Sequence, residues 1–152
     1  MRILIALCIM TALTTSPIWA QNTGIVNGTV SSRTLANNVE VLHPLKEARL
    51  SVHFVEPTSN NEQFPRFRAG PELTATTTDK NGRFTFLGLQ PGLVYIEVEA
   101  PGYVPVGFPV CVEVDDSRTL PIQLWTSATI GLPYQMAQYK YNANLGYRPG
   151  EC

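Results

Sequence analysis

Apolar and polar residues alternate along most of the chain, and no stretch shows the 3.6-residue repeat of an amphipathic helix. In "LVYIEVEA", Val94, Ile96 and Val98 share one face of an extended chain and the residues between them share the other. Alternation of this kind predicts half-buried β-strands. The strands predicted in this way are residues 24–30, 48–55, 73–78, 83–87, 93–100, 108–114 and 118–125.

Glycine and proline separate the predicted strands. The stretch "DKNG" has the composition of a hairpin turn, in which Gly82 adopts positive φ and Asp79 caps the backbone, and "GLQPG" breaks the chain again. Seven short strands with turns between them predict an all-β fold, an antiparallel seven-stranded Greek-key β-sandwich over residues 21–125. Two linkers in it are long, residues 31–46 and 56–72, and long linkers are often functional.

The same parity predicts which side chains form the core. Phe84 and Phe86 are expected to be buried, whereas His53 is expected to face outward into solvent. The other side chains predicted to face the core are Ala48, Leu50, Val52, Phe54, Val94, Ile96, Val98, Phe108, Val110, Val112, Val114, Leu120, Ile122 and Leu124.

Residues 1–20 have the pattern of a secretory signal peptide. A positive start at Arg2 precedes an apolar run over residues 3–13, and the segment ends in the small residue Ala20. The apolar run is too short to span a bilayer. Cys8 lies inside this run and not at the cleavage point, which argues against a lipid anchor. The protein is therefore expected to be exported, either to the periplasm or out of the cell.

Removal of the signal peptide leaves two cysteines, Cys111 and Cys152. In an exported protein they are expected to form one intramolecular disulfide; two free thiols, or pairing of Cys152 between chains, are the alternatives. Cys111 alternates with inward residues and so is expected to face outward. The bond then requires the aromatic tail, residues 126–152, to fold back over the sandwich, where its tyrosines would cover outward side chains such as Tyr95.

Three stretches, "ARLSV", "TTTDKNGRFTFLGLQPGLVYIEVEAPGYVP" and "VEVDDSRTLPIQL", resemble the carboxypeptidase regulatory-like domains. The resemblance covers residues 24–124 and implies a transthyretin-like (prealbumin-like) sandwich of a bacterial-type secreted protein. Domains of this kind are often appended to secreted enzymes and receptors. The positions that carry the resemblance serve turns or the core, so it implies a fold and no particular activity.

Two enzyme families with a related sandwich provide the alternative. The hydroxyisourate hydrolases end in Tyr-Arg-Gly-Ser, and this chain has only a partial match, because Pro149 follows Tyr147 and Arg148. The intradiol dioxygenases bind iron through two tyrosines and two histidines. Here His43 and His53 lie ten residues apart without a His-X-His pair. Neither family's catalytic pattern is complete.

The formal net charge of −1 and the lack of a basic patch argue against a nucleic-acid partner. Binding residues are therefore sought among exposed aromatic and arginine side chains, which suit protein or glycan contacts. The candidate binding loop consists of Phe64, Arg66, Phe67 and Arg68, and the candidate aromatic surface consists of Trp125, Tyr139 and Tyr141.

The sequence as a whole predicts a non-catalytic exported module without metal or cofactor. Its expected role is to bind a protein or carbohydrate ligand, or to act as an accessory, in the cell envelope or a secreted assembly. The alternative is a small transthyretin-like enzyme, either a hydroxyisourate hydrolase-like hydrolase or an intradiol dioxygenase-like oxidoreductase.

Overall fold

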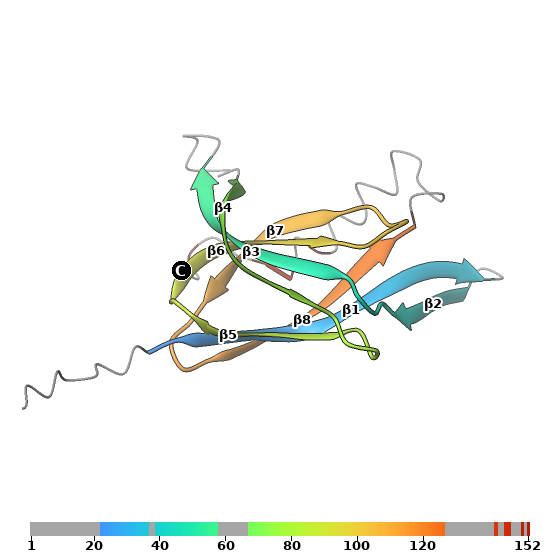
Figure 1. Ribbon diagram of the computed structural model, residues 1–152, viewed down its shortest axis with the longest axis horizontal. Coiled ribbons are helices and arrows are strands. Elements are labelled where there is room, and N and C mark those ends of the chain that lie inside the picture. The colour runs from blue at the N-terminus through green and yellow to red at the C-terminus, as the bar shows by residue number, and fades with distance from the viewer. Residues whose placement is uncertain are drawn as a thin grey trace, which may run out of the picture.

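The computed structural model contains eight β-strands in two four-stranded sheets that face each other (Figure 1). It describes residues 22–36, 39–57 and 67–126, together with Asn142, Leu145, Gly146, Gly150 and Cys152. The all-β sandwich predicted from the sequence is confirmed. The strands are β1 (Gly24–Ala36), β2 (Val39–Pro44), β3 (Arg49–Pro57), β4 (Phe67–Thr77), β5 (Arg83–Leu89), β6 (Gly92–Glu99), β7 (Val106–Val112) and β8 (Ser117–Trp125).

The first sheet is built around β1, its longest strand. On one side β1 pairs with β8 in parallel, from Ile25 opposite Ser117 to Arg33 opposite Trp125. On the other side it pairs with two antiparallel strands in turn, first β5 and then β2. Strands β5 and β2 therefore lie end to end along β1. The β1–β8 pair is an exception to the antiparallel pairing that the sequence predicts.

The second sheet has the order β4-β3-β6-β7, and all its pairs are antiparallel. The inward faces of its central strands are those predicted from the alternation. The phenylalanines Phe84 and Phe86 of the opposite sheet are also buried, with ring centroids 5.9 Å apart in an edge-to-face arrangement. The core residues that are at most 1% exposed include Leu50, Val52, Ile96, Val98, Phe108, Val110, Leu120, Ile122 and Leu124.

The turn between β4 and β5 is tight, as predicted, but the two strands belong to different sheets and so do not form a hairpin. A carboxylate oxygen of Asp79 accepts hydrogen bonds from the backbone N–H groups of Asn81 and Arg83, both at 2.8 Å. Gly82 has a φ of 71°, and a Cβ there would lie 2.4 Å from the carbonyl oxygen of Val30. Only glycine fits this turn, which joins one sheet to the other.

The structure corrects the predicted linkers. The segment 31–46, predicted as a loop, contains the second half of β1 and all of β2. The segment 56–72, also predicted as a loop, contains the end of β3 and the first six residues of β4. These strands were missed because most of their side chains are exposed on both faces, so they lack an apolar stripe.

Two predicted core residues are exposed. Val114 was expected to continue the inward face of β7, but the strand ends at Val112 and the chain turns at Asp115, where φ is 57°. Val114 is therefore 46% exposed. Phe54 lies on the inward face of β3 as predicted, yet it is 56% exposed because it borders an opening between the sheets.

Candidate binding site

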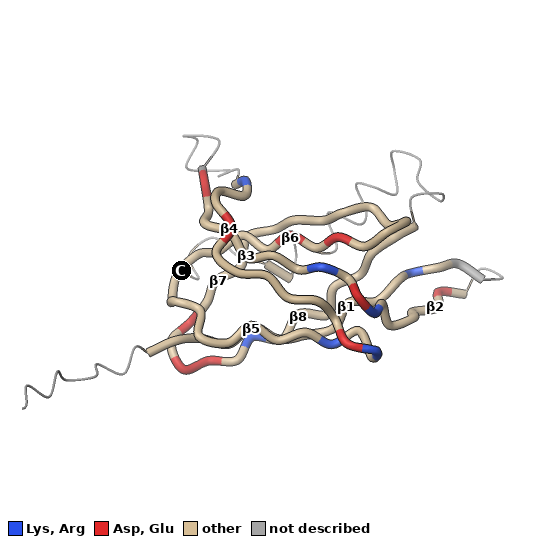
Figure 2. Tube along the Cα trace, in the orientation of Figure 1, with Lys and Arg blue, Asp and Glu red and all other residues tan. Residues whose placement is uncertain are grey.

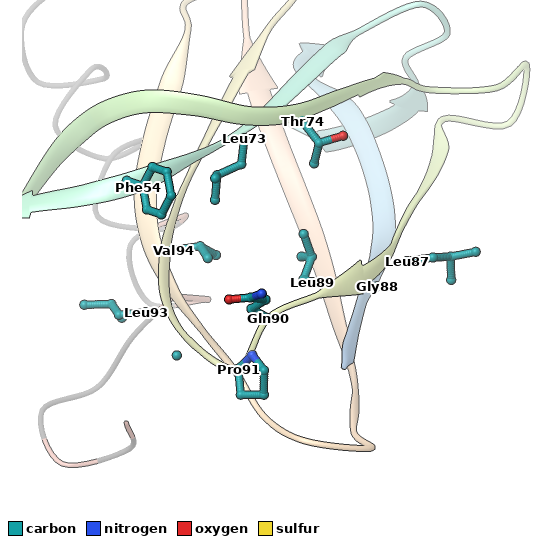
Figure 3. A pocket seen from close by; sticks show the side chains of 11 residues that line it. Phe54, Leu73, Thr74, Leu87, Gly88, Leu89, Gln90, Pro91, Leu93 and Val94 are labelled. Atoms are coloured by element: carbon teal, nitrogen blue, oxygen red, sulfur yellow. The ribbon is translucent and has the colours of Figure 1, made fainter. Parts of the chain in front are cut away.

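An apolar cleft of about 460 Å³ opens between β4, β5 and β6. In Figure 3, Phe54 of β3 and Leu73 of β4 lie at its rim, and Leu89 of β5 and Val94 of β6 lie deeper. The last two belong to the buried core, at 6% and 7% exposure. The cleft, hereafter the β4–β5 cleft, is therefore an entrance into the core and not a depression on its surface.

The opening follows from the way in which β4 and β5 leave their turn. Figure 1 shows the two strands close together at the turn over residues 78–83 and diverging toward the other end of the molecule. The register of β3 against β4 shifts twice, between Val52 and His53 and between His53 and Val55. Such irregularities bend a strand pair. The bent pair moves away from β5, which leaves the cleft between the two sheets.

The side chains that line the β4–β5 cleft are uncharged. None of its eleven lining residues carries an ionisable side chain; the polar ones are Thr74 and Gln90. Figure 2 shows no acidic or basic residue along the connection from β5 to β6. The sequence contains this signal, because no charged residue occurs between Arg83 and Glu97, but alternation alone did not reveal that the sheets separate there.

On the opposite side of the sandwich, at β7 and β8, the described residues of the C-terminal tail contact both strands. The disulfide joins Cys111 of β7 to Cys152, with 5.8 Å between the Cα atoms, as predicted. Leu145 packs against the core. A guanidinium nitrogen of Arg118 donates to the carbonyl oxygens of Leu145 and Gly146, at 3.2 and 2.9 Å. The tail thus supplies apolar and polar contacts at this side.

Only part of the predicted return of the tail over the sandwich falls within the described residues. Cys111 does point away from the core, since Val110 and Val112 belong to the core and Cys111 alternates with them. The described tail residues contact β7 through the disulfide, β8 through hydrogen bonds, and the core through Leu145. Tyr95, which the tail was expected to cover, lies beside Gly107: a Cβ on that glycine would be 2.6 Å from the tyrosine ring. Tyr139 and Tyr141 lie outside the described residues.

The candidate binding loop is only partly described. Phe64 and Arg66 lie outside the described residues, and Phe67 and Arg68 begin β4. Arg68 forms an ion pair with Glu56 of β3 at 2.7 Å. Its guanidinium therefore links β4 to β3.

Trp125, the described member of the candidate aromatic surface, has a partner within the chain. The guanidinium of Arg33 lies 5.0 Å from the centroid of its ring, within cation–π range. Arg33 in turn forms an ion pair with Glu40 of β2. One face of the tryptophan ring is thus engaged by the protein itself, which gives Trp125 a role in holding β1, β2 and β8 together.

The outer face of the second sheet carries a polar cluster. Arg49 forms ion pairs with Glu72 at 2.7 Å and with Glu99 at 3.4 Å, and the hydrogen bond to Glu72 is the main reason that the pKa of Arg49 is raised. His53 Nδ1 lies 2.9 Å from the carbonyl oxygen of Gly70. These contacts cross from β3 to both neighbouring strands, so they hold the sheet together.

His53 is outward as predicted, but it is not solvated. Its Nε2 lies 2.9 Å from the hydroxyl of Ser51 and 3.4 Å from a carboxylate oxygen of Glu97. His43 is exposed on β2, in the other sheet. Arg148 lies outside the described residues. Among the described residues, no group of three or more His, Cys, Asp or Glu side chains could hold a metal ion.

In the described part of the chain no helix is long and apolar enough to cross a membrane.

No curated protein matches the sequence. Similar solved structures include the Bacillus anthracis TIE protein (18% identity, TM-score 0.45, 69% of this chain and 17% of that one). The minor pilin GBS52 of Streptococcus agalactiae is also similar, with 16% identity and a TM-score of 0.48 over 74% of this chain and 48% of that one. A proposed carbohydrate-binding protein of Pseudomonas aeruginosa has 14% identity and a TM-score of 0.45 over 68% of this chain and 88% of that one. The match covers less than half of the length of the TIE protein and of GBS52.

A family model provides the more direct comparison. The model of the carboxypeptidase regulatory-like domain matches residues 65–125, which run from the start of β4 to the end of β8. This stretch includes the tight turn at Asp79 and the strands β5, β6 and β7. The resemblance seen in the sequence is thereby confirmed, and residues 65–125 carry the sequence signature of the carboxypeptidase regulatory-like domain family.

Proposed function

We propose that this protein is a non-catalytic, exported β-sandwich module that binds a ligand in the β4–β5 cleft. The observation that carries the proposal is the direct opening of the cleft into the core, with Phe54 and Leu73 exposed at its rim. Clustered exposed apolar side chains around a concave site are typical of binding sites. The volume of about 460 Å³ falls within the range of ligand sites, roughly 300–1,000 Å³.

The contrast between the two sides of the sandwich supports this function. The side between β7 and β8 is closed by Leu145 and by a disulfide, whereas the β4–β5 side is left open. Covering a large apolar side chain contributes roughly 1.5–3 kcal/mol when burial is complete. Phe54 and Leu73 are about half exposed, so part of that free energy is available to a ligand.

Export is the second component of the proposal. It rests on the signal-peptide pattern in residues 1–20, which lie outside the described residues, and on the disulfide between Cys111 and Cys152. Disulfides persist mainly in oxidising compartments outside the cytoplasm. The ligand would therefore be a protein or a carbohydrate of the cell envelope or its surroundings.

The experiment is photo-cross-linking in the producing cells, with p-benzoylphenylalanine placed at Phe54 and, as the control, at Val39. Val39 is 62% exposed but lies on β2, away from the cleft. We expect discrete adducts from position 54 only, on a chain that begins at Gln21 and is found outside the cytoplasm. Protease or glycosidase treatment of the adduct distinguishes protein from carbohydrate. A cytoplasmic chain with Met1 retained, or equal adduct formation at both positions, would contradict the proposal.

A further inference from the structure

We infer that the ligand of the β4–β5 cleft is an extended, uncharged peptide segment with alternating apolar side chains, which adds a strand to the edge of β4 at Leu73–Thr77. This inference rests on the proposed function and specifies the partner. Two features of the site lead to it: the absence of charge in the cleft and the free strand edge beside it. Each is argued separately below.

The absence of charge in the cleft excludes ionic ligands. A charged group entering a site without ionisable side chains would lose hydration and gain no ion pair, which is costly. The part of the ligand that enters must therefore be neutral and apolar, because Leu89 and Val94 line the interior and Leu73 lies at the rim. The cleft thus complements apolar side chains of a partner.

The strand edge beside the cleft specifies the backbone of the ligand. Within the described residues β4 pairs only with β3, so β4 forms an edge of the second sheet. The portion "LTATT" from Leu73 to Thr77 contains no charge, no proline and no glycine. Edges of this composition accept a further strand, whose main-chain hydrogen bonds provide affinity while neighbouring pockets select its side chains.

The two features act on the same partner strand. Thr74 and Thr76 lie opposite Val52 and Leu50, whose side chains belong to the core, so both threonines are on the inward face of β4. A strand added next to β4 continues this face. Its inward side chains would then be directed toward the gap between β4 and β5, where the cleft lies. A neutral small molecule or a lipid chain would use the cleft but leave the strand edge unpaired.

Two other stretches of strand edge, the first half of β4 and β8, are protected. The first half of β4 contains Gly70 and Pro71, and the register with β3 shifts on both sides of Glu72; all of these features hinder strand addition. On β8, the side chain of Asn142 hydrogen-bonds to the backbone N–H and C=O of Gln123. From Thr74 to Thr77, β4 has neither kind of protection.

The test uses the full mature chain and an acetylated, amidated heptapeptide of alternating threonine and leucine, which has no charge. Two derivatives carry N-methyl groups on either the leucine or the threonine nitrogens, which removes the donors along one edge at a time. Octyl glucoside serves as a neutral lipid-like probe. Binding is measured by titration, and the site is located by NMR shifts of backbone amides. The variants are Leu73→Lys and Phe54→Ser at the cleft rim, and Val39→Lys as the matched control.

We expect the parent peptide to shift the amides of Leu73–Thr77 and of Val94. At least one methylated derivative should bind at least tenfold more weakly than the parent. Leu73→Lys and Phe54→Ser should weaken binding by a similar factor, with melting curves showing that each variant is folded, and Val39→Lys should bind as the unmodified protein does.

Equal affinity of all three peptides would overturn strand addition, and so would octyl glucoside binding in the cleft without peptide binding. In either case the cross-linking at position 54 stands independently, so the class of partner would be wrong while the binding function remained. Peptide binding in the cleft without any adduct at position 54 in cells would support the class of partner and contradict the proposed binding function in cells.

Discussion

The side-chain amide of Asn142 bridges the backbone of Gln123 on β8. Its oxygen accepts from the Gln123 N–H at 3.0 Å, and its nitrogen donates to the Gln123 C=O at 2.8 Å. Asn142 is fully buried. A single side chain of the tail thus imitates the paired hydrogen bonds of a neighbouring strand. This contact, together with Leu145 and the disulfide, replaces a strand on that side of the sandwich.

Replacing Asn142 should destabilise the protein through these two hydrogen bonds. Asn142→Ala removes both partners from a buried site, and we expect a loss of about 1–3 kcal/mol in the free energy of unfolding. Asn142→Asp keeps the acceptor but directs a second oxygen at the Gln123 carbonyl, so it should not restore stability. Urea titration of the three proteins measures this. Equal stability of Asn142→Ala and the unmodified protein would show that the bridge is dispensable.

Removing the disulfide should destabilise the protein by restoring freedom to the unfolded chain. The bond links residues separated by 41 positions, for which loop-closure entropy gives about 4 kcal/mol. We expect the Cys111→Ser, Cys152→Ser double variant to unfold at a correspondingly lower urea concentration. A reducing agent should destabilise the unmodified protein and leave the double variant unchanged. A reducing agent that destabilised both equally would be acting elsewhere.

The inward face of β5 can be tested by comparing one buried and one exposed position of this strand. Phe84 is 4% exposed and packs edge-to-face on Phe86, so Phe84→Ala should cost about 3–5 kcal/mol. Leu87 is 72% exposed, and Leu87→Ala should change the stability by less than about 0.5 kcal/mol. Thermal or urea unfolding provides the comparison. Similar losses at both positions would mean that the parity of β5 is wrong.

Asp79 should make the folded state sensitive to acid. The hydrogen bonds from the backbone N–H of Arg83 and then of Asn81 lower the pKa of this carboxyl below its usual value. Because the pKa is depressed in the folded state, the stabilisation is present above the unfolded pKa of about 3.9 and is lost as pH falls through the lower, folded pKa. In Asp79→Asn this part of the pH dependence should disappear. The measurement is urea unfolding between pH 2 and 6; parallel pH profiles would contradict it.

The sequence predicted the core strands and the turns well, because each has a local signal. The alternation around Val94, Ile96 and Val98 predicts which face is buried, and "DKNG" predicts the tight turn, although this turn joins two sheets and does not close a hairpin. Strand β2 and the first half of β4 gave no such signal, since their pairing partners, not their own apolar residues, hold them in place. Their existence depends on tertiary contacts.

The cleft was beyond a sequence-based prediction for a related reason. Parity placed Phe54 on the inward face, and that is where it lies. Whether an inward residue is covered depends on the opposite sheet, and here the bent β3–β4 pair leaves β5 and exposes the residue. The disulfide, in contrast, could be predicted, because counting the cysteines that follow the expected signal peptide left a single pair.

Two glycines allow a final test of how β1 and β8 pack. A Cβ at Gly28 of β1 would lie 2.0 Å from the backbone oxygen of Leu120 on β8, which cannot move without breaking the parallel pair. Gly28→Ala should therefore cost about 1–3 kcal/mol, as overpacking does. At Gly107 the obstacle is the side chain of Tyr95, which can rotate away, so Gly107→Ala should be the milder change. Chemical denaturation of both variants measures the difference. If Gly28→Ala proved as mild as Gly107→Ala, the backbones of β1 and β8 would have to be farther apart than the register between them indicates.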